Sequence, residues 1–292
     1  MADLSALLDR CTFPAPGTEV VCGLSGGADS SALVALAIES GCLVTAVHVH
    51  HGLRNGADHD ADVAASTAAK LGAAFVVVHA DVDDGPNLEA RARTARLAAL
   101  GPGALTGHTA DDQAETLLLA LLRGSGASGL GAISPGPTHP ILALRRRDTE
   151  AVCAQLGLDI ATDPSNRDPR FRRNRIRHEL LPLLDDIAER DVTVLLDRTA
   201  GLVREDDRLL QQLADAIDPT DAVALTAAPR PLAARAIRRW LDRDGYPPDA
   251  AGIGRVLAVA AGESAACEVT GRGRIERQGG RLVLFPTEPA SG

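Results

Sequence analysis

Residues 25–30 have the composition and position of a phosphate-binding turn. They read Ser-Gly-Gly-Ala-Asp-Ser, directly after an apolar run and directly before a helix-forming run. Two glycines let backbone N–H groups approach an anion, and the opening helix adds unpaired N–H groups and a positive dipole end. The hydroxyls of Ser25 and Ser30 can donate to phosphate oxygens, whereas Asp29 would repel them unless a metal ion lay between. The segment predicts a phosphate cradle, with a plain glycine turn as the alternative, made by Ser25, Gly26, Gly27, Ala28, Asp29 and Ser30.

A second segment, residues 107–116, combines a histidine with three carboxylates where a strand is expected to pass into a helix. Asp112 and Glu115 are three residues apart, so they share one face of that helix, and His108 lies just ahead of it. Carboxylates in a first helical turn also interact well with the helix dipole, so capping is the alternative to catalysis. Facing a phosphate cradle, however, adjacent acids such as Asp111 and Asp112 suit a magnesium–triphosphate complex.

Arginine is concentrated in two places. Six arginines lie between residues 167 and 177 against one acid, Asp168. Such a loop is either merely solvated or a surface that neutralises RNA phosphates. The helical run 87–96 also carries arginines at neighbouring helix positions, and we weigh a solvated face there against a guanidinium that reaches an anionic nucleotide.

Composition restricts the class of protein. The 292 residues carry a net charge of −9, which excludes a generally basic nucleic-acid coat. Aromatic residues make up only 2% of the chain, so stacking on aromatic side chains is not its main way of binding bases. No apolar run is long enough to span a membrane, and we expect a cytoplasmic protein. The five cysteines are widely spaced and form no Cys-x-x-Cys, which predicts free thiols.

The elements that must position these residues alternate in the first part of the chain. Strands are expected at 18–24, 43–49, 74–80 and 104–107, with helices at 29–40, 57–71 and 88–100 between them. This pattern predicts an α/β fold with a doubly wound, mostly parallel sheet and helices on both faces. Ligands of such sheets bind at the carboxyl ends of strands, so residues 25–30, 50–54 and 107–112 are expected to meet in one crevice.

The last third of the chain has a different pattern. We expect a domain boundary near residue 200, giving domains at 1–200 and 201–292. Helices are expected at 231–243 and 249–261, and the alternation on both sides of Gly279-Gly280 predicts a β-hairpin. The second domain is therefore predicted to be a small α+β domain.

In sequence order, six motifs resemble those of the tRNA(Ile)-lysidine synthetase family within the wider PP-loop, or N-type ATP pyrophosphatase, group. They cover about residues 20 to 182: Ser-Gly-Gly-Ala-Asp-Ser from Ser25, His-Gly-Leu-Arg from His51, Asn-x-Glu-Ala-x-Ala-Arg from Asn87, Gly-His-x-x-Asp-Asp-Gln-Ala-Glu-Thr from Gly107, Arg-Gly-Ser-Gly from Arg123, and Asp-Pro-Ser-Asn with Arg-Asn-Arg-Ile-Arg from Asp163.

The resemblance implies an ATP-dependent ligase that joins free L-lysine to the wobble cytidine of the CAU anticodon of tRNA(Ile). An adenylated intermediate would form, with release of pyrophosphate and then AMP. The implied cofactors are ATP and Mg²⁺, and neither a membrane nor a stable protein partner is implied. The domain at 1–200 would be catalytic, and that at 201–292 would assist tRNA binding.

The resemblance also implies roles for residues of this chain. Residues 25–30 would hold ATP, Asp29 and Asp112 would meet magnesium, and His108, Asp111 and Asp112 would form the reacting centre. The expected contacts with lysine or tRNA are Glu115, Arg93, Arg173, Arg175 and Arg177. Two alternatives stay open: another PP-loop enzyme acting on tRNA, such as a 2-thiocytidine synthetase, and a non-catalytic nucleotide-binding module.

Overall fold

The computed structural model describes residues 3–50, 57–80, 88–161, 168–242 and 247–286. The chain divides into two compact units, Met1–Leu202 and Val203–Gly292. The first contains, in order, α1 (Leu4–Leu8), β1 (Glu19–Gly23), α2 (Ala28–Glu39), β2 (Leu43–His50), α3 (Ala57–Leu71), β3 (Ala74–His79), α4 (Leu88–Leu100), α5 (Ala110–Leu122), α6 (Ala127–Leu130), α7 (Arg146–Leu156), α8 (Arg172–Arg175), the π-helical turn η2 (Ile176–Leu180), α9 (Leu181–Ala188) and the start of α10 (Val192–Asp215).

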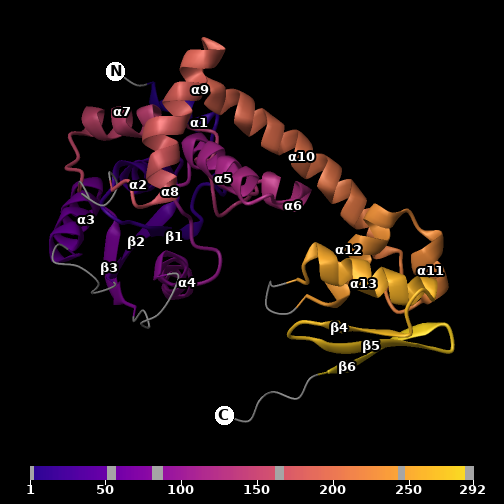
Figure 1. Ribbon diagram of the computed structural model, residues 1–292. Coiled ribbons are helices and arrows are strands. Elements are labelled where there is room, and N and C mark those ends of the chain that lie inside the picture. The colour runs from indigo at the N-terminus through magenta and orange to yellow at the C-terminus, as the bar shows by residue number, and fades with distance from the viewer. Residues whose placement is uncertain (1–2, 51–56, 81–87, 162–167, 243–246, 287–292) are drawn as a thin grey trace. The chain divides into compact units, whose positions relative to one another are not determined.

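The sheet of the first unit is parallel, with strand order β1-β2-β3 (Figure 1). On the free side of β1, Leu105 forms one parallel bridge with Cys22. After β3, the chain therefore continues the sheet on the opposite side of β1. This reversal of direction confirms the doubly wound sheet. The strand expected at 104–107 is reduced to that bridge, because the Thr106 N–H donates to the carbonyl of Thr138, 2.9 Å away, and so leaves the sheet.

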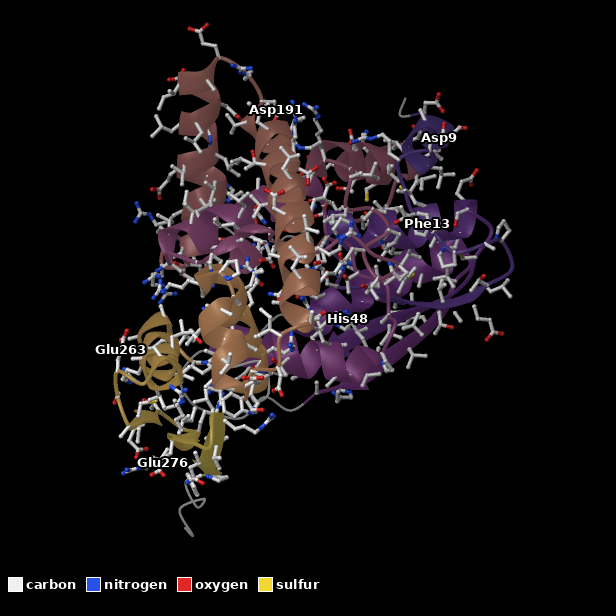
Figure 2. All side chains as sticks on the ribbon, turned by 90° about the vertical axis from the view of Figure 1, so that its right-hand side faces the viewer. Asp9, Phe13, His48, Asp191, Glu263 and Glu276 are labelled. Atoms are coloured by element: carbon white, nitrogen blue, oxygen red, sulfur yellow. The ribbon has the colours of Figure 1, made fainter. Side chains whose placement is uncertain are left out.

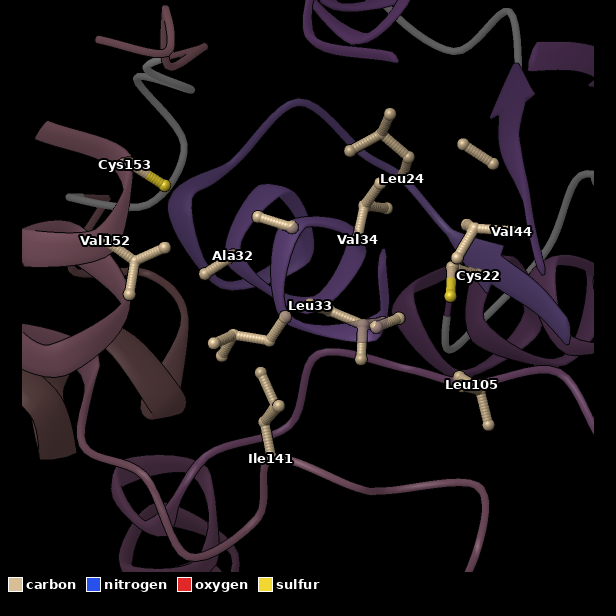
Figure 3. Close-up of a cluster of buried hydrophobic side chains, with 14 of the residues drawn as sticks. Cys22, Leu24, Ala32, Leu33, Val34, Val44, Leu105, Ile141, Val152 and Cys153 are labelled. Atoms are coloured by element: carbon tan, nitrogen blue, oxygen red, sulfur yellow. The ribbon is translucent and has the colours of Figure 1, made fainter. Parts of the chain in front are cut away.

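Helices cover both faces of this sheet, as predicted. Helix α2 packs in the larger core, where Leu33 and Val34 are buried with Leu24 and with Ile141 (Figure 3). On the other face, Leu100 at the end of α4 packs with Val47 of β2. Small and β-branched aliphatic side chains fill both cores, in keeping with the few aromatic residues.

The arginine-rich segment is helical over much of the part that the structure describes, which corrects the expectation of a loop. Residues 172–188 pass without interruption through α8, η2 and α9. Pro182 has no N–H for the carbonyl of His178, and its ring crowds that carbonyl, which accounts for a wider π-helical turn at this place. The helical conformation puts Arg173 and Arg177, four residues apart, on one face of this segment.

The second unit holds α11 (Ala222–Ala227), α12 (Arg230–Trp240), α13 (Ala250–Ala261) and an antiparallel sheet of β4 (Ala266–Val269), β5 (Gly273–Gln278) and β6 (Arg281–Pro286). The predicted hairpin is confirmed: Gly279 and Gly280, with φ of +56° and +82°, join β5 to β6. Ile237 and Ile275 lie in the hydrophobic core of the second unit. In the part of the chain that the structure describes, no helix has both the length and the hydropathy of a membrane span.

Candidate active site

The turn at residues 25–30 has the geometry of a phosphate cradle. Gly26 has φ +87°, which favours glycine, and Gly27 is the N-cap of α2. The hydroxyl of Ser30 donates to the Gly27 carbonyl (2.9 Å) and lies 3.1 Å from both the backbone nitrogen and the hydroxyl oxygen of Ser25. The Ser25 N–H thus donates to Ser30, and Ser25 itself is exposed at the mouth of the turn. Gly27, at the start of α2, is partly exposed, so an anion can approach the positive end of the helix dipole.

Gly107 lets the acidic segment, residues 107–116, approach the turn at residues 25–30. A Cβ atom at Gly107 would lie 2.7 Å from the backbone oxygen of Asp29 and 3.0 Å from the backbone nitrogen of Ser30. Only a residue without a side chain fits so close to the first turn of α2. Two of the three segments expected to meet in one crevice, 25–30 and 107–112, therefore lie together, whereas most of the third, residues 51–54, falls outside the described residues.

Asp112 caps α5, which is one of the two roles that its sequence position allowed, and its other carboxylate oxygen faces arginines. Its Oδ2 accepts from the N–H of Thr109 (2.9 Å), so it caps α5. Its Oδ1 faces three arginines at longer distances: 3.4 Å from Arg146, 3.4 Å from Arg173 and 3.8 Å from Arg177. Burial acts to raise the pKa of Asp112, but a hydrogen bond from His108 and the charges of Arg146 and Arg173 outweigh it, and this pKa lies well below its usual range. Asp112 is therefore an anion at neutral pH.

Glu115 is completely buried and is held by arginines of the segment 172–177. Arg177 donates to both carboxylate oxygens (2.6 and 3.0 Å), and the Nε of Arg173 donates at 2.7 Å. Arg146 adds a longer contact of 3.3 Å. A buried carboxylate of this kind needs such partners, since an unpaired charge would cost several kcal/mol, about 3–5 when one partner is removed.

Asp111 is turned away from Asp112 and Glu115 and toward the start of α7. Both of its oxygens accept from Arg145 at 3.0 Å, and Oδ2 also accepts from the backbone N–H of Arg146 at 2.7 Å. Arg145 also pairs with Asp191, which lies directly ahead of α10 (Figure 2). The geometry gives Asp111 a positioning role: it fixes the residues that begin α7, whereas its place in the reacting centre stays a prediction.

Asp29 lies in the first turn of α2 and contacts α7. It accepts from the hydroxyl of Thr149 and, at 3.4 Å, from Arg146. Burial raises the pKa of Asp29, against the opposing effects of Arg146 and Thr149. Arg146 thus contacts all three carboxylates of the acidic cluster, defined as Asp29, Asp112 and Glu115.

Sequence reasoning missed Arg145, Arg146 and Thr149. The signal available was the run Arg145-Arg146-Arg147 at the start of a helix, which resembles any solvated basic patch. Of the residues that were predicted, Arg175 stands apart, because it pairs with Glu179 on the exposed surface. Arg93 belongs to α4, but its side chain is outside the described residues.

His48 supports the end of β1, where the cradle begins. Its Nδ1 lies 2.9 Å from the carbonyl oxygen of Leu24, and the residue is only 5% exposed (labelled in Figure 2). Burial lowers the pKa of His48 below 6.5, against the opposing effect of the Leu24 hydrogen bond. The folded chain therefore binds fewer protons there than the unfolded chain, and stability must fall as the pH drops below 6.5 toward the folded pKa.

We expect His48→Asn to reduce this pH dependence, because the asparagine amide can replace the Nδ1 donor and does not titrate. Urea unfolding at about pH 7.5 and at about pH 5.5 measures the free energy of unfolding of the unsubstituted protein and of the variant. The other histidines contribute equally in the two proteins, so the difference between them reports on His48. An identical loss of stability in the two proteins would show that His48 is not the residue responsible.

Comparison with known proteins agrees with the fold. A family model described as PP-loop domain matches residues 3–184, so the first unit places the chain in this ATP-binding class. A second model, described as TilS substrate binding domain, matches residues 221–283. The chain belongs to the tRNA(Ile)-lysidine synthase family, as the resemblance of its motifs indicated.

Two relatives illustrate this similarity. The tRNA(Ile)-lysidine synthase of Nocardia farcinica is 44% identical over 245 residues, which cover 78% of this chain and 77% of that protein. The protein of the same name from Thermobifida fusca is 37% identical over 166 residues, covering 53% of this chain and 51% of the relative. Among solved structures, the U34-tRNA thiolase NcsA from Methanococcus maripaludis shares the fold, with a TM-score of 0.54 and 16% identity over 69% of this chain and 77% of that one.

Proposed function

We propose that this protein joins free L-lysine to the wobble cytidine of the isoleucine tRNA with the anticodon CAU. ATP adenylates the cytidine and releases pyrophosphate, and the ε-amine of lysine then displaces AMP. The names of the relatives support the reaction, and the substrate-binding model matched at residues 221–283 supports a tRNA-binding role for the second unit. The observation in this structure that carries the proposal is a phosphate cradle directly beside two buried carboxylates, Asp112 and Glu115.

The residues around the cradle fit ATP with magnesium. Gly27 begins α2 without a side-chain cap, which leaves N–H groups of the first helical turn for phosphate oxygens, and Ser25 supplies an exposed hydroxyl. Asp29 and Asp112 supply carboxylate oxygens, the ligands that magnesium prefers, and it usually completes its shell with phosphates and water. Among the described residues, no three His, Cys, Asp or Glu side chains gather as a metal centre. When bound, the ion would neutralise the charge that develops on the phosphates.

The acidic cluster suits the ammonium group of lysine. The ion pairs of Asp112 Oδ1 measure 3.4 Å or more, so this oxygen is held more loosely than the oxygens of Glu115, which are held at 2.6 and 2.7 Å. With its pKa below the usual range, Asp112 is a weak base and a strong electrostatic partner. We therefore assign it to binding and orienting the ε-ammonium rather than to removing its proton.

Purified protein with ATP, magnesium, radiolabelled lysine and a CAU-anticodon isoleucine tRNA tests the function. We expect label in the tRNA together with AMP. Methionine tRNA carries the same anticodon and is the control. Equal labelling of both tRNAs, or no labelling of either, would contradict the proposal.

The cysteines disfavour thiolation, the chemistry of the nearest alternative. All five are free and separate, and burial raises the pKa of Cys22 and of Cys153 to about 12. Thiols of this kind stay protonated at neutral pH and carry sulfur poorly. A non-catalytic nucleotide-binding module is disfavoured by the acidic cluster, because a passive binder gains nothing from buried carboxylates beside phosphates.

Two of the four arginines predicted to contact lysine or tRNA, Arg173 and Arg175, should behave differently when replaced. The side chain of Arg175 is 61% exposed, so Arg175→Gln should raise the KM for tRNA by a few fold and weaken its salt dependence, leaving the KM for lysine unchanged. Arg173 donates to buried Glu115, so Arg173→Gln should raise the KM for lysine as well. Initial rates at two salt concentrations measure both. The same pattern in both variants would contradict this division of roles.

A further inference from the structure

Arg146 links the nucleotide side of the site to the acidic cluster. Its Nε contacts Asp29 in the first turn of α2, its Nη2 contacts Asp112 and its Nη1 contacts Glu115. These carboxylates lie 117, 34 and 31 residues away along the chain. Three arginines contact the acidic cluster: Arg146, Arg173 and Arg177. Arg146 is the one whose described ion pairs include a residue of the cradle, Asp29.

The contacts of Arg146 are long. They measure 3.3 to 3.4 Å, whereas Arg173 and Arg177 hold Glu115 at 2.7 and 2.6 Å. Hydrogen bonds near 3.4 Å are weaker than bonds near 2.7 Å, so Arg146 can turn away at lower cost than its neighbours. The side chain is 22% exposed, which leaves it in reach of a ligand in the site.

The charges of the protein groups balance where the acidic cluster meets its arginines. Three carboxylates, Asp29, Asp112 and Glu115, face three guanidinium groups, Arg146, Arg173 and Arg177. An added ammonium group would leave one uncompensated positive charge in a largely buried place, which is unfavourable. A bound triphosphate supplies the missing negative charge, and its phosphates are bidentate partners that a guanidinium binds well.

We infer that Arg146 makes lysine binding depend on bound nucleotide: without nucleotide its guanidinium occupies the acid pair, Asp112 and Glu115, and with nucleotide it turns to the phosphates. Arg146 is then a positioning residue that imposes an order of binding, nucleotide before lysine. This inference rests on the proposed function, since it takes lysine as the substrate. The order has a chemical advantage, because the amine meets the acid pair only when the activating nucleotide is present.

Calorimetric titration of L-lysine into the full-length protein tests this dependence, with and without magnesium and an ATP analogue whose α,β-bridge is a methylene group. For the unsubstituted protein we expect lysine to bind at least about tenfold more tightly with the analogue, within the usual range of coupling between two ligands. Arg146→Gln should bind lysine with nearly the same affinity in both conditions. Arg146→Lys keeps a positive charge and should restore most of the dependence.

Arg147→Gln is the matched control, because Arg147 is the next residue in the chain, its side chain is 72% exposed and it forms an ion pair with Asp191, outside the acidic cluster. It should keep the full dependence on nucleotide. Equal lysine affinity with and without the analogue in the unsubstituted protein would overturn the inference, as would full dependence in Arg146→Gln. If lysine bound in neither condition and no label entered tRNA, the proposed function itself would fall, which separates the two failures.

Discussion

Replacing Asp112 by asparagine is expected to lower the rate of lysine incorporation by about two to three orders of magnitude, the range seen when one electrostatic contact to a reacting group is lost. The substitution removes the negative charge of Oδ1, which faces the cluster of arginines, but keeps an amide oxygen that can accept from the Thr109 N–H. The cap of α5 is thus preserved while the partner for the ammonium is lost. Steady-state rates with labelled lysine and isoleucine tRNA measure the effect.

Two measurements separate this loss from damage to the fold. Asp112→Asn leaves three guanidinium groups against two carboxylates, so its thermal unfolding temperature should fall, and incorporation is compared at a temperature where circular dichroism shows both proteins folded. Binding of nucleotide without magnesium should persist, because residues 25–30 are unchanged. Asp111→Asn is a useful comparison, because the Asp111 carboxylate holds Arg145 and the N–H of Arg146 rather than facing the cluster. Undiminished incorporation by Asp112→Asn would remove Asp112 from the lysine site.

The second large effect is expected at Gly107. A Cβ atom there would lie 2.7 Å from the backbone oxygen of Asp29 and 2.8 Å from its carbonyl carbon. Because both are main-chain atoms, no side chain can move aside, and either α2 or residues 106–109 must shift. We expect Gly107→Ala to lower the free energy of unfolding by about 1–3 kcal/mol, the usual cost of overpacking. It should also weaken nucleotide binding, since the clash separates the cradle from the acidic segment.

Gly136→Ala is the control for this substitution. A Cβ atom at Gly136 meets nothing within 4 Å, so alanine should be tolerated there with no measurable loss. Urea unfolding and titration with the ATP analogue, carried out on both variants, measure stability and binding separately. A Gly107→Ala protein with unchanged stability and nucleotide affinity would show that the close approach to α2 is not needed.

Local patterns predicted the elements of this protein well. The alternation of apolar runs and helical segments indicated a parallel sheet with helices on both faces, and Gly279-Gly280 indicated the hairpin of the second unit. The fourth expected strand is one bridge at Leu105, because Thr106 bonds to Thr138, which lies 32 residues away. The arginine-rich segment forms helix where a loop was expected, since its helical face packs on α5 through residues such as Ile176. In both cases a tertiary contact overrode the local pattern.

By itself, the sequence determined the residue types that carry the chemistry and their places relative to the strands, because a glycine turn, a helix start and a period of apolar residues are local properties. It could not decide which charges pair, because a guanidinium can reach any carboxylate that the fold brings near. The partners of Arg146 lie up to 117 residues away, and Asp111 and Asp112, adjacent in the chain, serve different helices. Only the tertiary structure placed one arginine between the phosphate cradle and the acid pair.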